Sequence, residues 1–255
     1  MQKPWEERHR PPVIMGILNA TPDSFYDGGS YAALPRAQQI FAEGGALIDI
    51  GGESTRPGAA AVPIEEEISR VIPALKAIKQ QFPEAVISVD TYNFATARAA
   101  LENGAKIIND VSALQDLRLA KLAADYGAKL VIMHARGRPQ NMQSMTEYGD
   151  ILKEIYDFFE DKISAAVSAG LPRESVILDV GLGFAKTTEQ NWFLLENLNY
   201  FKPLSLPQLV GASRKKFTGG ALDGSLKAAA FAAKNGAAIL RVHDVAATKK
   251  MLEAL

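Results

Sequence analysis

The chain has 255 residues, 47% of them hydrophobic, and a formal net charge of −1, which argues against binding nucleic acid or an anionic membrane surface through a global basic field. It contains no cysteine, which excludes disulfides, thiolate metal sites and a cysteine nucleophile. No apolar signal core precedes residue 13 and no run of about 18 apolar residues occurs, so we expect a soluble cytoplasmic protein.

Short apolar runs alternate along the chain with helical patterns. The runs are near-continuous, which is typical of parallel strands that helices cover. Between two of them, segment 64–81 carries apolar residues at steps of three and four, as an amphipathic helix does. The expected strands are residues 13–18, 46–50, 85–90, 106–110, 129–134, 175–179, 208–213 and 237–243.

Several expected helices end just before a glycine that can adopt the left-handed conformation, and the next strand follows shortly. These glycines are Gly44, Gly104, Gly127, Gly170 and Gly236. The length allows one large domain or two small ones, and eight strands alternating with helices match a closed (β/α)8 TIM barrel, a single α/β domain over residues 1–255. An open doubly wound sheet is the competing architecture, but the glycine-rich dinucleotide fingerprint is missing after the first strand.

Polar residues stand at the ends of these strands, and in a barrel of this kind the strand ends meet at the face that holds the active site. Carboxylates and amides end the third, fourth and sixth strands, whereas cations gather on the second, seventh and eighth. We therefore predict a mouth that binds a donor-rich polar ring on one side and an anion on the other. The residues concerned are Asn19, residues 53–56, Asp90, Thr91, Asn109, Asp110, His134, Asp179, residues 213–215, Arg241 and His243.

These polar residues also have a plainer interpretation. Asp, Asn, Ser and Thr are favoured where a helix begins after a strand, and we assign Asp110 and Thr91 to such capping. Arg241 and His243 are two residues apart on an expected strand, so they should point the same way. A single strand can simply turn polar as it leaves the core, but the recurrence of the pattern favours an anion site.

Six segments carry the motifs of one known enzyme family. They are MGILNATPDSFYDGG (15–29), IDIGGESTRPGA (48–59), SVDT (88–91), INDVSAL (108–114), SRKKF (213–217) and RVHDV (241–245). They closely resemble dihydropteroate synthase, occur in the family's order, and the first two are long and specific. The resemblance implies a TIM barrel, usually a homodimer, that uses Mg²⁺ in folate biosynthesis. Such an enzyme joins 6-hydroxymethyl-7,8-dihydropterin diphosphate to 4-aminobenzoate and releases pyrophosphate.

The resemblance also assigns the pterin contacts. A reduced pterin has an amino-pyrimidinone edge with adjacent N–H donors, which a carboxylate can accept in pairs. By resemblance, Asp179 takes that edge, and Met133 and Phe184 form apolar walls, although plain packing explains these two equally well. The full set implied for the pterin diphosphate is Thr55, Asp90, Asn109, Met133, Asp179, Phe184, Gly211, Lys215, Arg241 and His243.

Catalysis in the family depends on stabilising the leaving group and on positioning, without a covalent nucleophile. The resemblance gives these catalytic roles to Lys215, Arg241 and His243. Asn19 resembles the Mg²⁺ contact, which suits an ion that takes oxygen ligands and keeps most of its waters. The 4-aminobenzoate site and its closing loops are implied to include Phe25, Asp27, Arg56, Pro57 and Lys216.

The sequence departs from the family in three places. DVGLGFAK (179–186) replaces the usual Asp-Pro-Gly-Phe-Gly-Phe-Gly-Lys, and the loop after the fifth strand is unusually basic, with Arg136 and Arg138. The segment between SRKKF and the last strand is shorter than usual. This segment contributes to the dimer surface in the family, so the resemblance leaves the oligomeric state open.

Two alternatives remain. A pterin-binding methyltransferase domain that serves a corrinoid protein shares the barrel and the carboxylates, but would not need the lysine of SRKKF or the RVH anion site, so it ranks well below. A non-catalytic paralogue that binds a pterin is the second, because the DVGLGFAK segment is altered.

Overall fold

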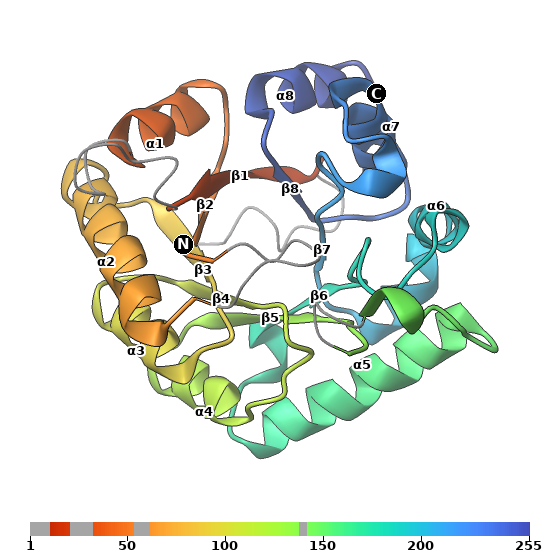
Figure 1. Ribbon diagram of the computed structural model, residues 1–255, viewed down its shortest axis with the longest axis horizontal. Coiled ribbons are helices and arrows are strands. Elements are labelled where there is room, and N and C mark those ends of the chain that lie inside the picture. Colours follow the sequence, from red (N-terminus) through yellow and green to blue (C-terminus); the bar gives the residue numbers. More distant parts are fainter. Residues whose placement is uncertain (1–10, 21–32, 54–61, 138–141) are drawn as a thin grey trace.

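The computed structural model describes residues 11–20, 33–53, 62–137 and 142–255. Within these ranges, eight parallel strands pair in chain order and close into a barrel, with β8 pairing back to β1. Viewed down the barrel, the helices form an outer ring that the chain follows once round, from α1 to α8 (Figure 1). The predicted (β/α)8 barrel is confirmed.

The strands are β1 (Val13–Asn19), β2 (Leu47–Gly51), β3 (Val86–Asp90), β4 (Ile107–Asp110), β5 (Lys129–Met133), β6 (Val176–Asp179), β7 (Gln208–Val210) and β8 (Ile239–Val242). The α-helices are α1 (Ala33–Ala42), α2 (Ile64–Gln81), α3 (Phe94–Glu102), α4 (Arg118–Asp125), α5 (Ile151–Ser168), α6 (Thr188–Glu196), α7 (Leu222–Lys234) and α8 (Val245–Glu253). The short 3₁₀ helices are η3 (Met142–Ser144), η4 (Arg173–Ser175), η5 (Leu198–Leu204) and η6 (Lys216–Thr218).

The helix and the left-handed turns predicted from local patterns are confirmed. The predicted helix 64–81 is α2, which buries Val71, Leu75 and Ile78 against the sheet. The five glycines predicted to follow helices all have positive φ, between 58° and 104°. The last two strands are shorter than predicted, because β7 ends at Val210 and β8 at Val242, after which the chain turns out into loops.

The interior of the barrel positions the site through the two-residue repeat of the strands. Its lower layer is apolar and fully buried, and consists of Met15, Leu47, Ile107, Val131, Ile177, Leu209 and Ile239. Two residues further along, toward the C-terminal ends of the same strands, stand Ile17, Asp49, Asn109, Met133, Asp179, Gly211 and Arg241. The apolar layer therefore closes the bottom of the barrel interior. The layer above it, which holds Asp49, Asn109, Asp179 and Arg241, faces the mouth, where such barrels carry their active sites.

A larger apolar core lies between the strands and the helices. Its fully buried members include Phe159 of α5 and Phe201 of η5, whose rings meet edge to face with centroids 5.8 Å apart. Burial on this scale fixes the strands and hence the mouth. In the described part of the chain, no helix combines the length and the apolar character needed to span a membrane.

Candidate active site

Arg241 of β8 lies in the mouth between two carboxylates. Its Nε donates to Asp49 Oδ2 at 2.6 Å and its Nη2 donates to Asp90 Oδ2 at 2.7 Å. Both carboxylates are buried, whereas the Arg241 side chain is 19% exposed. Gly211 lies against the stem of Arg241, so its missing side chain leaves that stem uncovered. The guanidinium is thus held in place while one side of it can meet a ligand.

Asp49 was missed by the sequence analysis, although it organises this half of the mouth. It lies in the middle of β2, fully buried, and its Oδ2 accepts from Arg241 and also from Asn109 Nδ2 at 3.1 Å. A carboxylate inside an otherwise apolar strand was the available signal, because a buried charge needs a partner. Because Asp49 lies in the middle of its strand, it is not among the residues at the strand ends.

Several oxygen atoms around Arg241 are buried and have no hydrogen-bond partner among the described residues. Three of them, Oδ1 of Asp49, of Asp90 and of Asn109, belong to side chains of this cluster. Buried acceptors without donors are costly, so such atoms commonly mark the place where a ligand binds. This wall of the mouth is therefore suited to a ring that carries N–H donors.

The charges in this cluster oppose one another. Burial raises the pKa of Asp90, and the nearby carboxylate of Asp49 raises it further, whereas the Arg241 guanidinium lowers it. Arg241 stays protonated, because the two carboxylates raise its pKa against the effect of its own burial. Two acids around one base leave this wall acidic, which favours donor groups on a bound ring.

The opposite wall is the loop that follows β6. Asp179 ends the strand, and its Oδ1 accepts from the backbone N–H of Gly181 at 2.8 Å. Burial raises the Asp179 pKa, and the charge of Lys215 is the main influence that lowers it. The half-buried Phe184 and the buried Met133 stand on this side, as the pterin walls in the family pattern would.

Lys215 reaches this wall from the loop after β7. Its Nζ donates to the backbone carbonyl of Leu182 and lies 4.6 Å from the centre of the Phe184 ring. Burial lowers the pKa of Lys215 to about 8, while Asp179 raises it and Arg241 lowers it further. The predicted pterin residues Asp90, Asn109, Asp179, Lys215 and Arg241 thus converge on one region of the barrel mouth.

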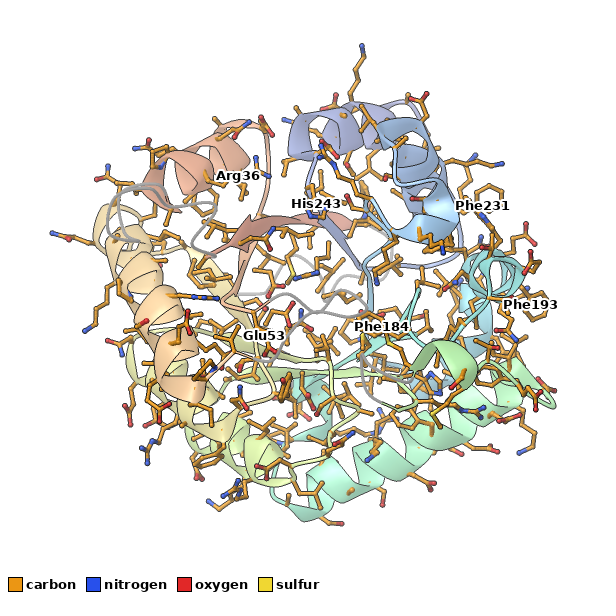
Figure 2. The ribbon with its side chains drawn as sticks, viewed as in Figure 1. Arg36, Glu53, Phe184, Phe193, Phe231 and His243 are labelled. Carbon is orange, nitrogen blue, oxygen red and sulfur yellow. The ribbon has the colours of Figure 1, made fainter. Side chains whose placement is uncertain are left out.

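A separate cleft of about 610 Å³ opens between β1, α1 and the start of α8. It is lined by Asn19 and His243, and by the basic residues Arg36 and Arg214. Figure 2 shows Arg36 of α1 beside His243, whose backbone carbonyl accepts from Arg36 Nη2 at 2.6 Å. β8 ends at Val242, so His243 lies just beyond the strand that carries Arg241, and it borders this cleft. That the two side chains point the same way stays a prediction.

Ser213 fixes the ring of His243. The Ser213 Oγ accepts from the backbone N–H of His243 at 3.2 Å and lies 3.0 Å from its Nδ1. These two contacts hold the backbone and the ring of His243 at the end of β8.

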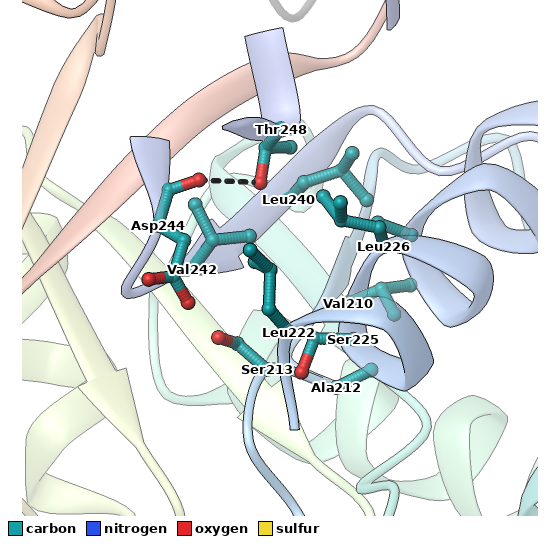
Figure 3. A pocket seen from close by; sticks show the side chains of 11 residues that line it. Val210, Ala212, Ser213, Leu222, Ser225, Leu226, Leu240, Val242, Asp244 and Thr248 are labelled. Atoms are coloured by element: carbon teal, nitrogen blue, oxygen red, sulfur yellow. Dashed lines mark hydrogen bonds between the residues drawn. The ribbon is translucent and has the colours of Figure 1, made fainter. Parts of the chain in front are cut away.

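A second hollow lies behind β8, where β7 and β8 pack against α7 and α8 (Figure 3). Its volume is about 10 Å³ and its lining is mostly apolar, including Val210, Leu226 and Leu240. A space of this size holds at most one water molecule. We regard it as a packing gap of the helical layer.

The remaining predicted residues fall into three groups. The helix-capping roles predicted for Asp110 and Thr91 are wrong, because the N-cap residues of α4 and α3 are Leu117 and Asn93. Asp110 instead accepts from the backbone N–H groups of Ser112 and Leu114, and Thr91 from that of Asn93, so both order the loop that follows their strand. Lys216 is exposed at the start of η6, and its predicted role stays a prediction. Phe25, Asp27, Thr55, Arg56 and Pro57 lie outside the described residues.

Comparison with known proteins identifies the family. The family described as pterin binding enzyme matches residues 15–243. A dihydropteroate synthase from Synechocystis is 45% identical over 92% of this chain and 86% of its own length. Two solved structures superpose closely on this chain. Yersinia pestis dihydropteroate synthase with a sulfonamide drug complex has a TM-score of 0.89 and 41% identity, over 96% of this chain and 93% of that one. Xanthomonas albilineans dihydropteroate synthase with 4-aminobenzoic acid has a TM-score of 0.86 and 40% identity, over 96% of this chain and 92% of that one.

The chain belongs to the dihydropteroate synthase family.

The departure from the family pattern in the β6 loop is accommodated. Val180, Leu182 and Ala185 are buried, and Ala185 adopts φ 49°, the left-handed conformation that the usual glycine takes without steric cost. A side chain there costs roughly 1–2 kcal/mol. The loop thus keeps a left-handed turn at Ala185 although alanine replaces the usual glycine.

Arg136, in the unusually basic loop after β5, pairs with Glu154 and stacks on the Tyr148 ring at 3.8 Å.

Proposed function

We propose that this chain works as a dihydropteroate synthase, and that it joins 6-hydroxymethyl-7,8-dihydropterin diphosphate to 4-aminobenzoate with release of pyrophosphate. The convergence of Asp90, Asn109, Asp179 and Lys215 around Arg241 carries this proposal. Such a mouth offers acceptors on both sides and cations between them. A reduced pterin that bears a diphosphate presents donors and negative charge in the same way.

Pterin binding follows from the acceptors. Asp179 accepts the paired N–H donors of the amino-pyrimidinone edge. Its Oδ1 accepts from one backbone N–H, and a carboxylate has two oxygens that can each accept more than one donor, so acceptor capacity remains for the pterin. Asp90 and Asn109 meet other heteroatoms of the ring through oxygens that lack partners in the described structure. Lys215 donates to the carbonyl side of the pterin ring, and its ammonium group, which lies over the Phe184 ring, borders the pterin site.

Departure of pyrophosphate is the step that needs positive charge. The bond between the exocyclic methylene and its oxygen breaks, the electron-rich pterin delocalises the resulting positive charge, and the neutral amine of 4-aminobenzoate attacks the methylene and then loses a proton. Arg241 uses two of its five N–H donors in the bonds to Asp49 and Asp90, so the guanidinium retains donors for the leaving group. His243 supplies a further donor from the neighbouring cleft.

Mg²⁺ suits the donor set at the cleft. No group of three or more His, Cys, Asp or Glu side chains in the described ranges could hold a metal, whereas Asn19 is exposed there as a single amide ligand. Such a site fits an ion held chiefly by phosphate oxygens and water. When bound, Mg²⁺ supplies charge that stabilises the leaving pyrophosphate.

Three further parts of the proposal concern the loops, the assembly and the location. Phe25, Asp27, Arg56, Pro57 and Lys216 form the 4-aminobenzoate site in the family pattern, and loops that exclude water would protect the cation. A homodimer is supported by large apolar side chains left exposed on the outer ring, among them Phe193 and Leu222; Figure 2 shows Phe193 at that rim. The cytoplasmic location stays a prediction.

The test is an assay of purified protein with the pterin diphosphate, Mg²⁺ and radiolabelled 4-aminobenzoate. Labelled dihydropteroate is expected, and a sulfonamide should compete with 4-aminobenzoate because it mimics that substrate. Pterin binding without product would support the non-catalytic paralogue, and methyl transfer to a corrinoid protein would support the methyltransferase. Sedimentation analysis of the same sample tests the dimer.

A further inference from the structure

Lys186 is a buried lysine that the proposed chemistry does not use. It follows the β6 loop, only 4% of its surface is exposed, and its Nζ is directed away from solvent toward three acceptors. These are Nδ1 of His134, the carbonyl oxygen of Gly181 and the carbonyl oxygen of Phe184, each at 3.0 Å. An ammonium group has three N–H donors, so the three acceptors match it one for one.

The protonation state of His134 fits this arrangement. Burial lowers the pKa of His134 to about 2, and the charge of Lys186 lowers it too, so His134 is neutral and its Nδ1 can accept. Burial also lowers the pKa of Lys186, to about 7, whereas the nearby carboxylate of Asp179 raises it. His134 is itself held edge to face against Phe158, with ring centroids 4.9 Å apart. This contact helps to orient the acceptor that follows β5.

The three bonds close the β6 loop on itself and on the end of β5. The backbone N–H of His134 donates to the Asp179 carbonyl at 2.8 Å, and Gly181 packs so tightly that any Cβ would overlap the His134 carbonyl oxygen. Lys186 then fixes the carbonyl of Gly181, whose N–H binds Asp179, and the carbonyl of Phe184. Lys186 thus holds from behind the two residues that face the pterin.

We propose that Lys186 is a positioning residue of the synthase reaction, and that with His134 it holds Asp179 and Phe184 in the geometry that binds the pterin. This inference rests on the proposed function. It differs from the role of Lys215, which reaches the same loop from the open side of the mouth. Lys186 touches neither substrate in this scheme and acts through the loop alone.

Lys129 provides a matched control at the other end of β5. It is also a buried lysine, 7% exposed, and its Nζ donates to a backbone carbonyl, that of Glu174, at 2.7 Å. It begins the strand that His134 follows, and so lies toward the bottom of the barrel, where stability rather than catalysis is decided. Replacement of either lysine by methionine removes one buried ammonium and keeps the stem.

The experiment compares Lys186→Met and Lys129→Met in the full chain, and the wild type is assayed in parallel for formation of dihydropteroate. Binding of 6-hydroxymethylpterin is measured by calorimetry and unfolding by urea. Lys186→Met should weaken pterin binding about tenfold or more, and Lys129→Met by less than about twofold, even if both lower stability equally. Equal effects on binding would overturn the proposal. An inactive wild type would instead refute the proposed function and leave the binding comparison readable.

A second variant guards against misfolding of Lys186→Met. His134→Phe keeps the aromatic contact with Phe158 and removes one acceptor, so it should weaken pterin binding less than Lys186→Met does. The two changes should be non-additive in the double variant, because they break one interaction. In the wild type the backbone N–H groups of Gly181 and Gly183 donate to Asp179 and Asn191. Hydrogen exchange at these two amides should be faster in both single variants. Additive effects with unchanged exchange would contradict the positioning role.

Discussion

The two walls of the mouth hold their charged groups by different means. On the wall built from β2, β3, β4 and β8, charges meet directly, since Arg241 bridges Asp49 and Asp90. On the wall built from the β6 loop, charged groups meet backbone: Lys215 and Lys186 donate to loop carbonyls, and Asp179 accepts from a loop amide.

This difference separates what each wall contributes. Direct pairing of buried charges makes the first wall part of the stability of the barrel, because removal of one partner strands the others. Backbone bonding makes the second wall depend on the conformation of one loop, so its charges can change with less effect on folding. We expect substitutions in the first wall to impair both stability and activity, and substitutions in the second to impair chiefly ligand binding.

Arg241→Ala should have the largest effect. It leaves Asp49 and Asp90 buried without their cation, which should lower the free energy of unfolding by about 3–5 kcal/mol. Turnover should fall by about 10²–10³-fold, more than the affinity for a pterin without phosphate, because leaving-group stabilisation is lost. Urea unfolding and steady-state kinetics measure the two. Arg118→Ala, which breaks an exposed pair with Asp116, is the control and should change neither; normal stability of Arg241→Ala would contradict the contrast.

Asp179→Asn should separate binding from stability. The amide keeps the shape and one acceptor but donates where the pterin also donates, so pterin affinity should fall about 10–100-fold. Stability should stay level or rise, because burial disfavours the charge that the substitution removes, as the raised pKa of Asp179 indicates. Calorimetry and urea unfolding test both, and near-normal affinity would refute the role assigned to this residue.

Asp49→Asn tests the first wall more finely, since Arg241 keeps Asp90 as a partner. Loss of one charged hydrogen bond should lower the free energy of unfolding by about 1–3 kcal/mol. The charge of Asp49 is one cause of the raised Asp90 pKa, so its removal should lower that pKa. Pterin binding needs the ionised Asp90, so the pH at which pterin affinity rises should be lower in Asp49→Asn than in the wild type. A pH series of binding measurements would show no displacement if the two carboxylates were independent.

The pH response of Lys215 should be the smallest effect and has opposite signs for binding and folding. Its folded pKa of about 8 lies below the ordinary 10.5, so the unfolded chain binds more protons between these values. The contribution of Lys215 to stability therefore rises with pH in that window, whereas pterin affinity falls as the ammonium is lost. Lys215→Met should weaken both trends when binding and urea midpoints are compared at about pH 7 and pH 10, and Lys186, whose pKa is also lowered, accounts for part of the stability trend that remains. A wild-type affinity that did not change over this range would argue against a cationic role.

The sequence by itself determined the architecture of this protein and the position of the mouth. Strand alternation, the helix 64–81 and the glycines after helices are read from neighbouring residues, because pleat, helical repeat and left-handed turns are local properties. Family motifs then indicated most of the polar side chains at the strand ends. The roles of the residues that lie outside the described ranges remain predictions.

Only the tertiary structure decided which of these groups pair. Asp49 and Arg241 are 192 residues apart and meet because barrel closure places β8 beside β1 and thus near β2. Likewise His134 and Lys186 come from successive strand ends, and neither segment shows in its own sequence that one accepts from the other. A buried charge or donor signals that it needs a partner, but the partner is chosen by strand order and register, which no local pattern contains.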